Sequence, residues 1–170
     1  MAVLKLVRNE YRNEDAINNL INYVLDDEKM PNRCFGGNGI SLYTPAKCMY
    51  TVKSVFHQTT GKQAEHFILA FNKNEICSLT IPVISKIAYD VCDFFKESQI
   101  LFAVHEVKNT YYSDDYENDS LHIHFILNPI NLQNGLKLRI DYNNEFDLKN
   151  YIEAVLCNYN VSDKVLLKAN

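Results

Sequence analysis

Residues 121–128 read Leu121-His122-Ile123-His124-Phe125-Ile126-Leu127-Asn128, a run of strand-forming residues that carries two histidines two positions apart. Alternate side chains of a strand share a face, so His122 and His124 project the same way, about 7 Å apart along the chain. The apolar side chains between them face the core. Two imidazoles on one rigid strand suit a divalent cation when a neighbouring strand supplies a third donor. The alternative is a half-polar strand whose histidines are hydrogen-bonded or face solvent.

The segments on either side of this strand predict an α+β fold, with a central, mostly antiparallel sheet and helices packed on it. Asn13 and Thr44 are expected to cap the first two helices, and Pro129 is expected to end the central strand. Apolar periodicity predicts helices at 14–25, 45–58, 80–96 and 147–157, and strands at 2–7, 65–71, 100–105, 121–127, 136–142 and 164–167. The glycine-containing segment 34–42 is interpreted as a loop.

A third histidine stands at the end of the strand predicted at 100–105. That strand and the central one are expected to form an antiparallel pair, joined by a polar, tyrosine-rich loop at 109–120. The pairing brings His105 beside His122 and His124, which predicts a metal site with open positions for water or a phosphate oxygen. His66 lies on another predicted strand and either lines the same surface or is an ordinary sheet histidine.

Neutral imidazoles that bind a cation usually need hydrogen-bond acceptors behind them. The acidic residues close enough in sequence are Glu65, Glu106 and Asp119, and the residues leave the choice among them open.

Length and composition indicate one domain that buries an ordinary core: 170 residues, 47% hydrophobic and 22% charged. The five cysteines show no C-x-x-C spacing, which favours buried thiols in a reducing compartment. No apolar run has membrane-spanning length and no signal peptide is evident, so a cytoplasmic location is expected. The formal net charge of −4 argues against a nonspecific nucleic-acid binder, although a local basic rim remains compatible with it.

Tyr23 lies near the end of the first predicted helix, in Asn22-Tyr23-Val24-Leu25-Asp26-Asp27-Glu28-Lys29. A tyrosine oxygen is a competent nucleophile on a phosphodiester when a cation stabilises the charge that develops on the phosphate. On periodicity alone, the alternative is a helix residue half-buried against the core.

Together these motifs resemble the relaxases, or mobilisation nucleases, of conjugative and mobilisable elements, which belong to the His-hydrophobic-His (HUH) superfamily of single-strand endonucleases. The segment 21–29 is similar to the first family motif. The segment 65–71, Glu-His-Phe-Ile-Leu-Ala-Phe, resembles the next motif, with Ala70 where members have serine. His105 together with 121–128 resembles the third motif, which carries three metal-binding histidines and a trailing asparagine.

The resemblance implies an HUH fold with a ferredoxin- or RRM-like palm over residues 1–170, as one domain and the N-terminal part of a longer protein. It implies that Tyr23 is the nucleophile, that His105, His122 and His124 bind Mg²⁺ or Mn²⁺, and that His66, Glu106 and Asn128 support those ligands. Members commonly carry an acid two positions after the first metal histidine, where this chain has Val107 and only Glu106 is near.

The activity that the resemblance implies is nicking of one DNA strand at a transfer origin, through a covalent 5′-phosphotyrosine that the free 3′ hydroxyl later reverses. The implied setting is a bacterial cytoplasm, with single-stranded or hairpin DNA as substrate and with relaxosome accessory proteins and a type IV coupling protein as partners. The alternatives are a rolling-circle replication initiator or transposase of the same superfamily, a degenerate DNA-binding domain that does not cut, and a metalloenzyme unrelated to DNA.

Overall fold

The computed structural model describes residues 1–8, 11–77, 79–106, 121–162 and 164–169. The loop expected at 109–120, which includes Asp119, lies outside the described residues, and so does Val107. The elements in chain order are β1 (Ala2–Val7), α1 (Ala16–Val24), β2 (Phe35–Asn38), α2 (Pro45–Val55), β3 (Glu65–Ala70), α3 (Lys73–Ile76), α4 (Ile81–Cys92), a 3₁₀ turn (Asp93–Phe95), β4 (Ser98–His105), β5 (His122–Asn131), α5 (Tyr142–Asn158) and β6 (Val165–Ala169).

The strands form one six-stranded sheet in the order β2-β4-β5-β3-β1-β6. All neighbours are antiparallel except β1 and β6, which run parallel. The predicted α+β class, with a mostly antiparallel sheet, is therefore confirmed, as is the antiparallel pairing of the strands that end and begin at His105 and His122.

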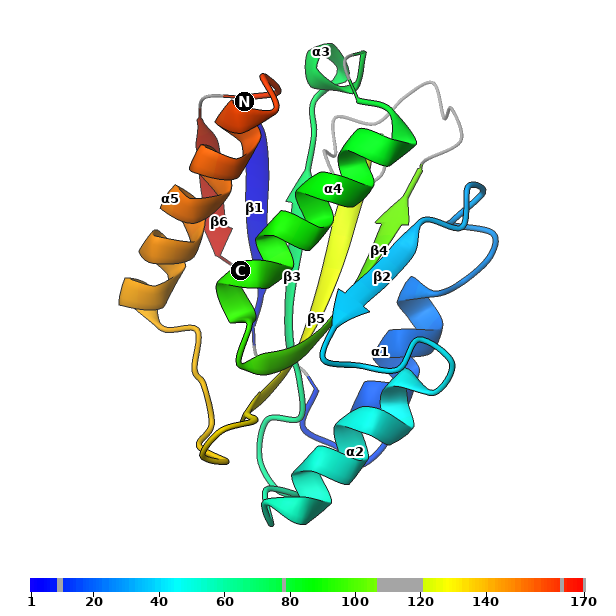
Figure 1. The fold of residues 1–170 in the computed structure, drawn as a ribbon, viewed down its shortest axis with the longest axis vertical. Coiled ribbons are helices and arrows are strands. Elements are labelled where there is room, and N and C mark those ends of the chain that lie inside the picture. Colours follow the sequence, from blue (N-terminus) through cyan, green and yellow to red (C-terminus); the bar gives the residue numbers. More distant parts are fainter. Residues whose placement is uncertain (9–10, 78, 107–120, 163, 170) are drawn as a thin grey trace.

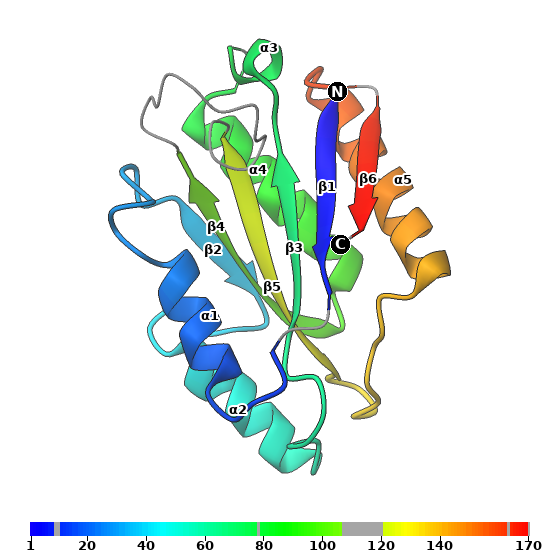
Figure 2. The same cartoon turned by 180° about the vertical axis from the view of Figure 1, so that it is seen from behind.

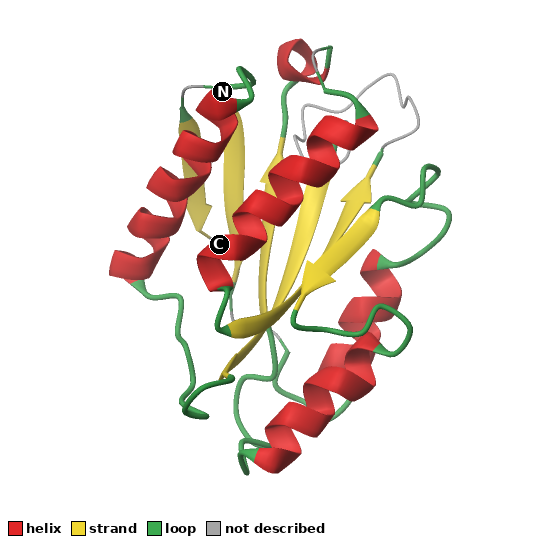
Figure 3. Ribbon diagram, viewed as in Figure 1, coloured by secondary structure: helices red, strands yellow, loops and turns green. Residues whose placement is uncertain are grey.

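Helices cover both faces of this sheet (Figures 1 and 3). On one face α4 and α5 pack over a core that includes Phe67, Phe102 and Phe125. On the other face α1 and α2 lie across the strands (Figure 2). The apolar stripe of α1 recurs at helical spacing, and all its members are buried: Ala16, Ile17, Leu20, Ile21 and Val24. That stripe fixes which side of α1 remains toward solvent. Within the described part of the chain, no helix is both long and apolar enough to cross a membrane.

Two predictions about strands are wrong: the loop at 34–42 and the end of the central strand at Pro129. Segment 34–42 contains β2, because Gly36 and Gly37 allow the chain to approach β4 and α4 closely: a Cβ on Gly37 would lie 2.2 Å from the Ile100 carbonyl oxygen. The central strand continues through Pro129 to Asn131. Proline is tolerated there because the last pair with β3 is Glu65–Leu127 and the ladder with β4 is irregular beyond it.

The remaining differences concern segment 136–142 and the helix ends. Residues 136–142 form no strand and make only an isolated bridge between Ile130 and Lys137. Helix α1 begins after Asp15, not after an Asn13 cap, and α5 begins earlier than 147 because the Asp141 side chain accepts a hydrogen bond from the Asn144 amide.

Candidate metal centre

Three histidines share one face of the sheet, the face covered by α1. His105 and His122 are directly paired across β4 and β5, and His124 lies two residues further along β5, between Ala103 and Ile68. Because directly paired residues and alternate residues of a strand share a face, the register alone brings the three imidazoles together. We call His105, His122 and His124 the histidine cluster.

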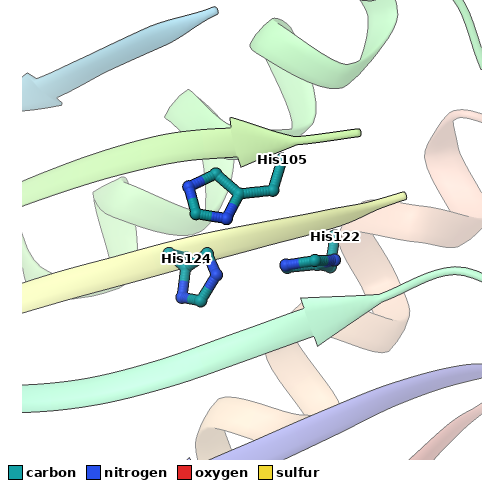
Figure 4. A group of neighbouring side chains, drawn as sticks. All are labelled: His105, His122 and His124. Carbon is teal, nitrogen blue, oxygen red and sulfur yellow. The ribbon is translucent and has the colours of Figure 1, made fainter. Parts of the chain in front are cut away.

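In the histidine cluster, one ring nitrogen from each residue lies within 4.8 Å of the other two. Figure 4 shows the three rings converging from β4 and β5. All three side chains are buried, and their ring centroids are 4.3–5.2 Å apart. Nitrogens at this separation can move onto one divalent ion with small side-chain rotations, since metal–nitrogen bonds of about 2 Å place ligand atoms roughly 3 Å apart.

Hydrogen bonds fix which nitrogen of two of these rings faces the cluster. The Nε2 of His105 lies 2.8 Å from the carbonyl oxygen of Val24, which can only accept, so Nε2 carries the proton and Nδ1 is left as the ligand atom. The Nδ1 of His124 lies 2.9 Å from the Nε2 of His66. The Nε2 of His124 is buried and has no hydrogen-bond partner among the described residues. A buried nitrogen without a partner is costly, and a bound cation would satisfy it.

Burial keeps these imidazoles neutral. It lowers the pKa of His105 to about 4 and that of His66 to about 3, and it lowers the pKa of His124 well below its ordinary value. Neighbouring histidines and lysines lower all three further. Neutral imidazole is the form that binds metal, so His105 and His124 can accept a cation at neutral pH.

Stability should consequently fall as pH drops. His66 and His105 have lower pKa values in the folded state than in the unfolded chain, so between about pH 6.5 and 4 the unfolded chain binds more protons. At pH 5 each of these two residues should lower the free energy of unfolding by about 2 kcal/mol relative to its value at pH 7.5. Urea denaturation in EDTA at the two pH values measures this loss.

Two variants isolate the source of that pH dependence. His66→Gln removes one buried imidazole and should make the loss between pH 7.5 and 5 smaller. His57→Asn removes an exposed histidine and should leave the loss unchanged. Equal pH dependence in wild type and His66→Gln would contradict the assignment to buried histidines.

Tyr23 is brought to the histidine cluster from the last turn of α1. Its ring lies edge-on to His124, with 5.7 Å between centroids, and to His105, with 6.2 Å between centroids. The side chain is 50% exposed, so a ligand can reach it from solvent. The Nζ of Lys29 lies 3.7 Å from the centre of the Tyr23 ring. The hydrogen bond from His105 to Val24 ties this end of α1 to the cluster.

The side-chain hydrogen bonds and ion pair of the other candidate residues, Glu106, Asn128 and Glu65, are made with residues outside the cluster. The Glu106 carboxylate accepts a hydrogen bond from Asn32, while the carbonyl of Val24 is the acceptor behind His105. Asn128 lies further along β5 than His124, and its buried side-chain amide donates a hydrogen bond to the Gln99 side-chain oxygen on β4. Glu65 pairs with Lys62.

One further residue, Tyr11, was not found from the sequence. Its hydroxyl lies 2.8 Å from the Nδ1 of His66. Tyr11, Tyr23, His66 and His124 line one cavity of about 520 Å³, which opens beside the cluster. Tyr11 lies outside the described helices and strands, and neither spacing nor periodicity connects it to His66. A cavity of this size accommodates a nucleotide-sized ligand.

A comparison with family models identifies the family of this chain. A model described as "Relaxase: MobA/VirD2-like, nuclease domain" matches residues 23–161. The chain belongs to the relaxase family. The matched range starts at Tyr23 and includes all three cluster histidines. Neither the curated proteins nor the solved structures contain a match. A relaxase nuclease domain acts on DNA as a nicking endonuclease, and relaxases generally require a metal ion.

Proposed function

We propose that this relaxase cuts one strand of DNA by attack of the Tyr23 hydroxyl on a phosphodiester, with a divalent cation, Mg²⁺ or Mn²⁺, held by His105, His122 and His124. The observation that carries the proposal is the approach of Tyr23, on a helix, to two of the three histidines on the sheet. A cation bound there would polarise the scissile phosphate and stabilise the charge of the transition state.

The bonding changes of the proposed reaction balance without any nucleotide cofactor. The Tyr23 oxygen forms a bond to phosphorus and the bond from phosphorus to the 3′ oxygen breaks, which leaves a 5′-phosphotyrosine and a free 3′ hydroxyl. The proton of the phenol leaves as the new bond forms, and the departing 3′ oxygen takes up a proton. Because the phosphotyrosine conserves the energy of the phosphodiester, attack by a 3′ hydroxyl restores the DNA strand.

Positive charge around the site supports a phosphate ligand. The ammonium of Lys29 lies over the Tyr23 ring and places a positive charge beside the proposed nucleophile. Lys5 and Lys62 stand close enough to His66 to act on it electrostatically. This local charge offers a DNA backbone a favourable approach although the whole chain carries a net charge of −4. Lys53, which is 1% exposed, contributes no surface charge.

The biological setting that we propose is mobilisation of a conjugative plasmid or transposon. The DNA would be a single-stranded or hairpin segment of the element's transfer origin, and accessory relaxosome proteins and a type IV coupling protein would be the partners. A replication initiator or transposase of the same superfamily would use the same chemistry on a different DNA site, so the choice of oligonucleotide distinguishes them.

The direct test is incubation with a 5′- or 3′-labelled single-stranded oligonucleotide from the transfer origin and Mn²⁺. The proposal expects a protein–DNA adduct that resists denaturing electrophoresis and a free 3′ hydroxyl on the other fragment. An oligonucleotide from a replication origin that gives the adduct where the transfer origin does not would favour the initiator. A gel shift without an adduct or cut strand would favour a binding domain and overturn the proposal.

A further inference from the structure

Tyr11, His66 and His124 form a continuous line of hydrogen bonds behind the histidine cluster. The Tyr11 hydroxyl lies 2.8 Å from the Nδ1 of His66, and the Nε2 of His66 lies 2.9 Å from the Nδ1 of His124. The two imidazole planes differ by only 20°. The line ends at His124, whose Nε2 is buried and has no partner among the described residues. The His124 ring lies 4.3 Å from the His105 ring, between centroids.

Only one arrangement of protons along this line lets His124 bind a cation. The lone pair of Nε2 must be free, so the His124 proton must sit on Nδ1 and be donated to the Nε2 of His66. His66, neutral and accepting at Nε2, then carries its proton on Nδ1 and donates it to the Tyr11 oxygen. The Tyr11 hydroxyl accepts and directs its own proton away from His66.

The opposite arrangement closes the site. If Tyr11 donates to the Nδ1 of His66, then His66 donates from Nε2 to the Nδ1 of His124, and the His124 proton must sit on Nε2. That proton occupies the position that a cation needs. Each neutral ring carries one proton on one of its two nitrogens. The donor and acceptor roles in the two hydrogen bonds therefore reverse together.

We infer that Tyr11 and His66 are positioning residues, a relay that sets the proton of His124 on Nδ1 and thereby opens its Nε2 to the cation. This inference rests on the proposed function, because it assumes that the cluster binds a cation. Residues behind a ligand histidine usually fix its tautomer through a carboxylate or a backbone carbonyl. Here the group in contact is itself an imidazole, and its own tautomer depends on a tyrosine.

The backbone of Tyr11 supports a specific role for that side chain. Its φ angle is +64°, in the left-handed region that bulky residues rarely adopt. The amide of Gln63 donates to the Tyr11 carbonyl at 2.7 Å, and the Gln63 side chain is held in turn by the carbonyls of Thr59 and Gly61. The segment before β3 therefore holds Tyr11 in an unfavourable conformation that sets its hydroxyl on His66.

Cation affinity in four variants tests the relay, by calorimetric titration of the full chain with Mn²⁺ at pH 7.5. Tyr11→Phe leaves His66 without an acceptor at Nδ1, and affinity should fall about tenfold. His66→Gln presents an amide oxygen that accepts from His124 without help from Tyr11, so affinity should stay within about threefold of wild type. In the double variant, Tyr11→Phe should therefore cost nothing further. Tyr50→Phe removes a nearby hydroxyl that donates to the Glu14 carbonyl, and should bind like wild type.

A second measurement reads the proton position itself. Nitrogen-15 spectra of the histidine rings should show the His124 proton on Nδ1 in wild type, both free of cation and loaded with Zn²⁺ as a diamagnetic probe. In cation-free Tyr11→Phe the His124 proton should shift toward Nε2.

Equal affinity and equal tautomers in wild type and Tyr11→Phe would overturn the relay while leaving the metal site intact. The relay would also be overturned if Tyr11→Phe lowered Mn²⁺ affinity tenfold in the His66→Gln variant as well as in wild type. Tyr11 would then act through general structural support, which does not depend on His66. Wild type that binds no cation at all would instead remove the proposed function.

Discussion

Tyr23→Phe should abolish formation of the protein–DNA adduct and reduce strand cleavage by at least about a thousandfold, because the variant lacks the oxygen that forms the bond to phosphorus. The ring itself should keep its place. Phenylalanine retains the edge contacts with His105 and His124, and the side chain is half exposed, so no buried hydrogen bond is lost. The measurement is adduct yield and cleavage rate on a labelled single-stranded oligonucleotide with Mn²⁺.

Two accompanying measurements make the loss specific to the hydroxyl of Tyr23. Tyr43→Phe removes a hydroxyl from a side chain that is 99% exposed, and should leave the adduct yield unchanged. Binding of Mn²⁺ and of DNA to Tyr23→Phe should also match wild type. Cleavage by Tyr23→Phe at the wild-type rate would mean that water is the nucleophile, and the assignment of Tyr23 would be wrong.

The convergence of the histidine cluster could be predicted from sequence because it depends on strand geometry. Alternation places His122 and His124 on one face, and an antiparallel partner that ends at His105 must set that residue opposite the start of the next strand. The apolar stripe of α1 could be predicted from its periodicity in the same way. It determines that Tyr23 lies beside the buried face of the helix.

The line of hydrogen bonds through Tyr11, His66 and His124 could not be predicted from the sequence in the same way. His66 could be placed on the correct strand, but its contact with His124 depends on the pairing of β3 with β5, which the residues do not specify. Tyr11 follows no periodic pattern, and its approach to His66 depends on a left-handed backbone held by Gln63. The same limit applies to β2, where two glycines suggested a loop although they serve close packing against β4.

His124→Ala should abolish cation-dependent nicking, with a loss on the order of a thousandfold or more, while DNA binding changes by no more than a few-fold. Removing the imidazole takes away the nitrogen that lacks a partner in the cluster, and with it a ligand needed to hold the cation at the scissile phosphate. Most DNA affinity should come from phosphate contacts outside the cluster, which the substitution leaves in place. Chelation of wild type with EDTA should have the same effect as the substitution, and added Mn²⁺ should restore wild type only.

Because His124 is 2% exposed, its replacement by alanine also leaves a buried cavity, which lowers stability independently of cation binding. His122→Ala provides an independent test at a position that is 8% exposed, and His57→Asn controls for loss of a histidine elsewhere. Circular dichroism and gel-shift measurements on each variant separate unfolding from loss of the cation. If folded His122→Ala and His124→Ala both nick DNA at the wild-type rate in Mn²⁺, the histidine cluster holds no catalytic cation. Tyr23 would then have to act without one.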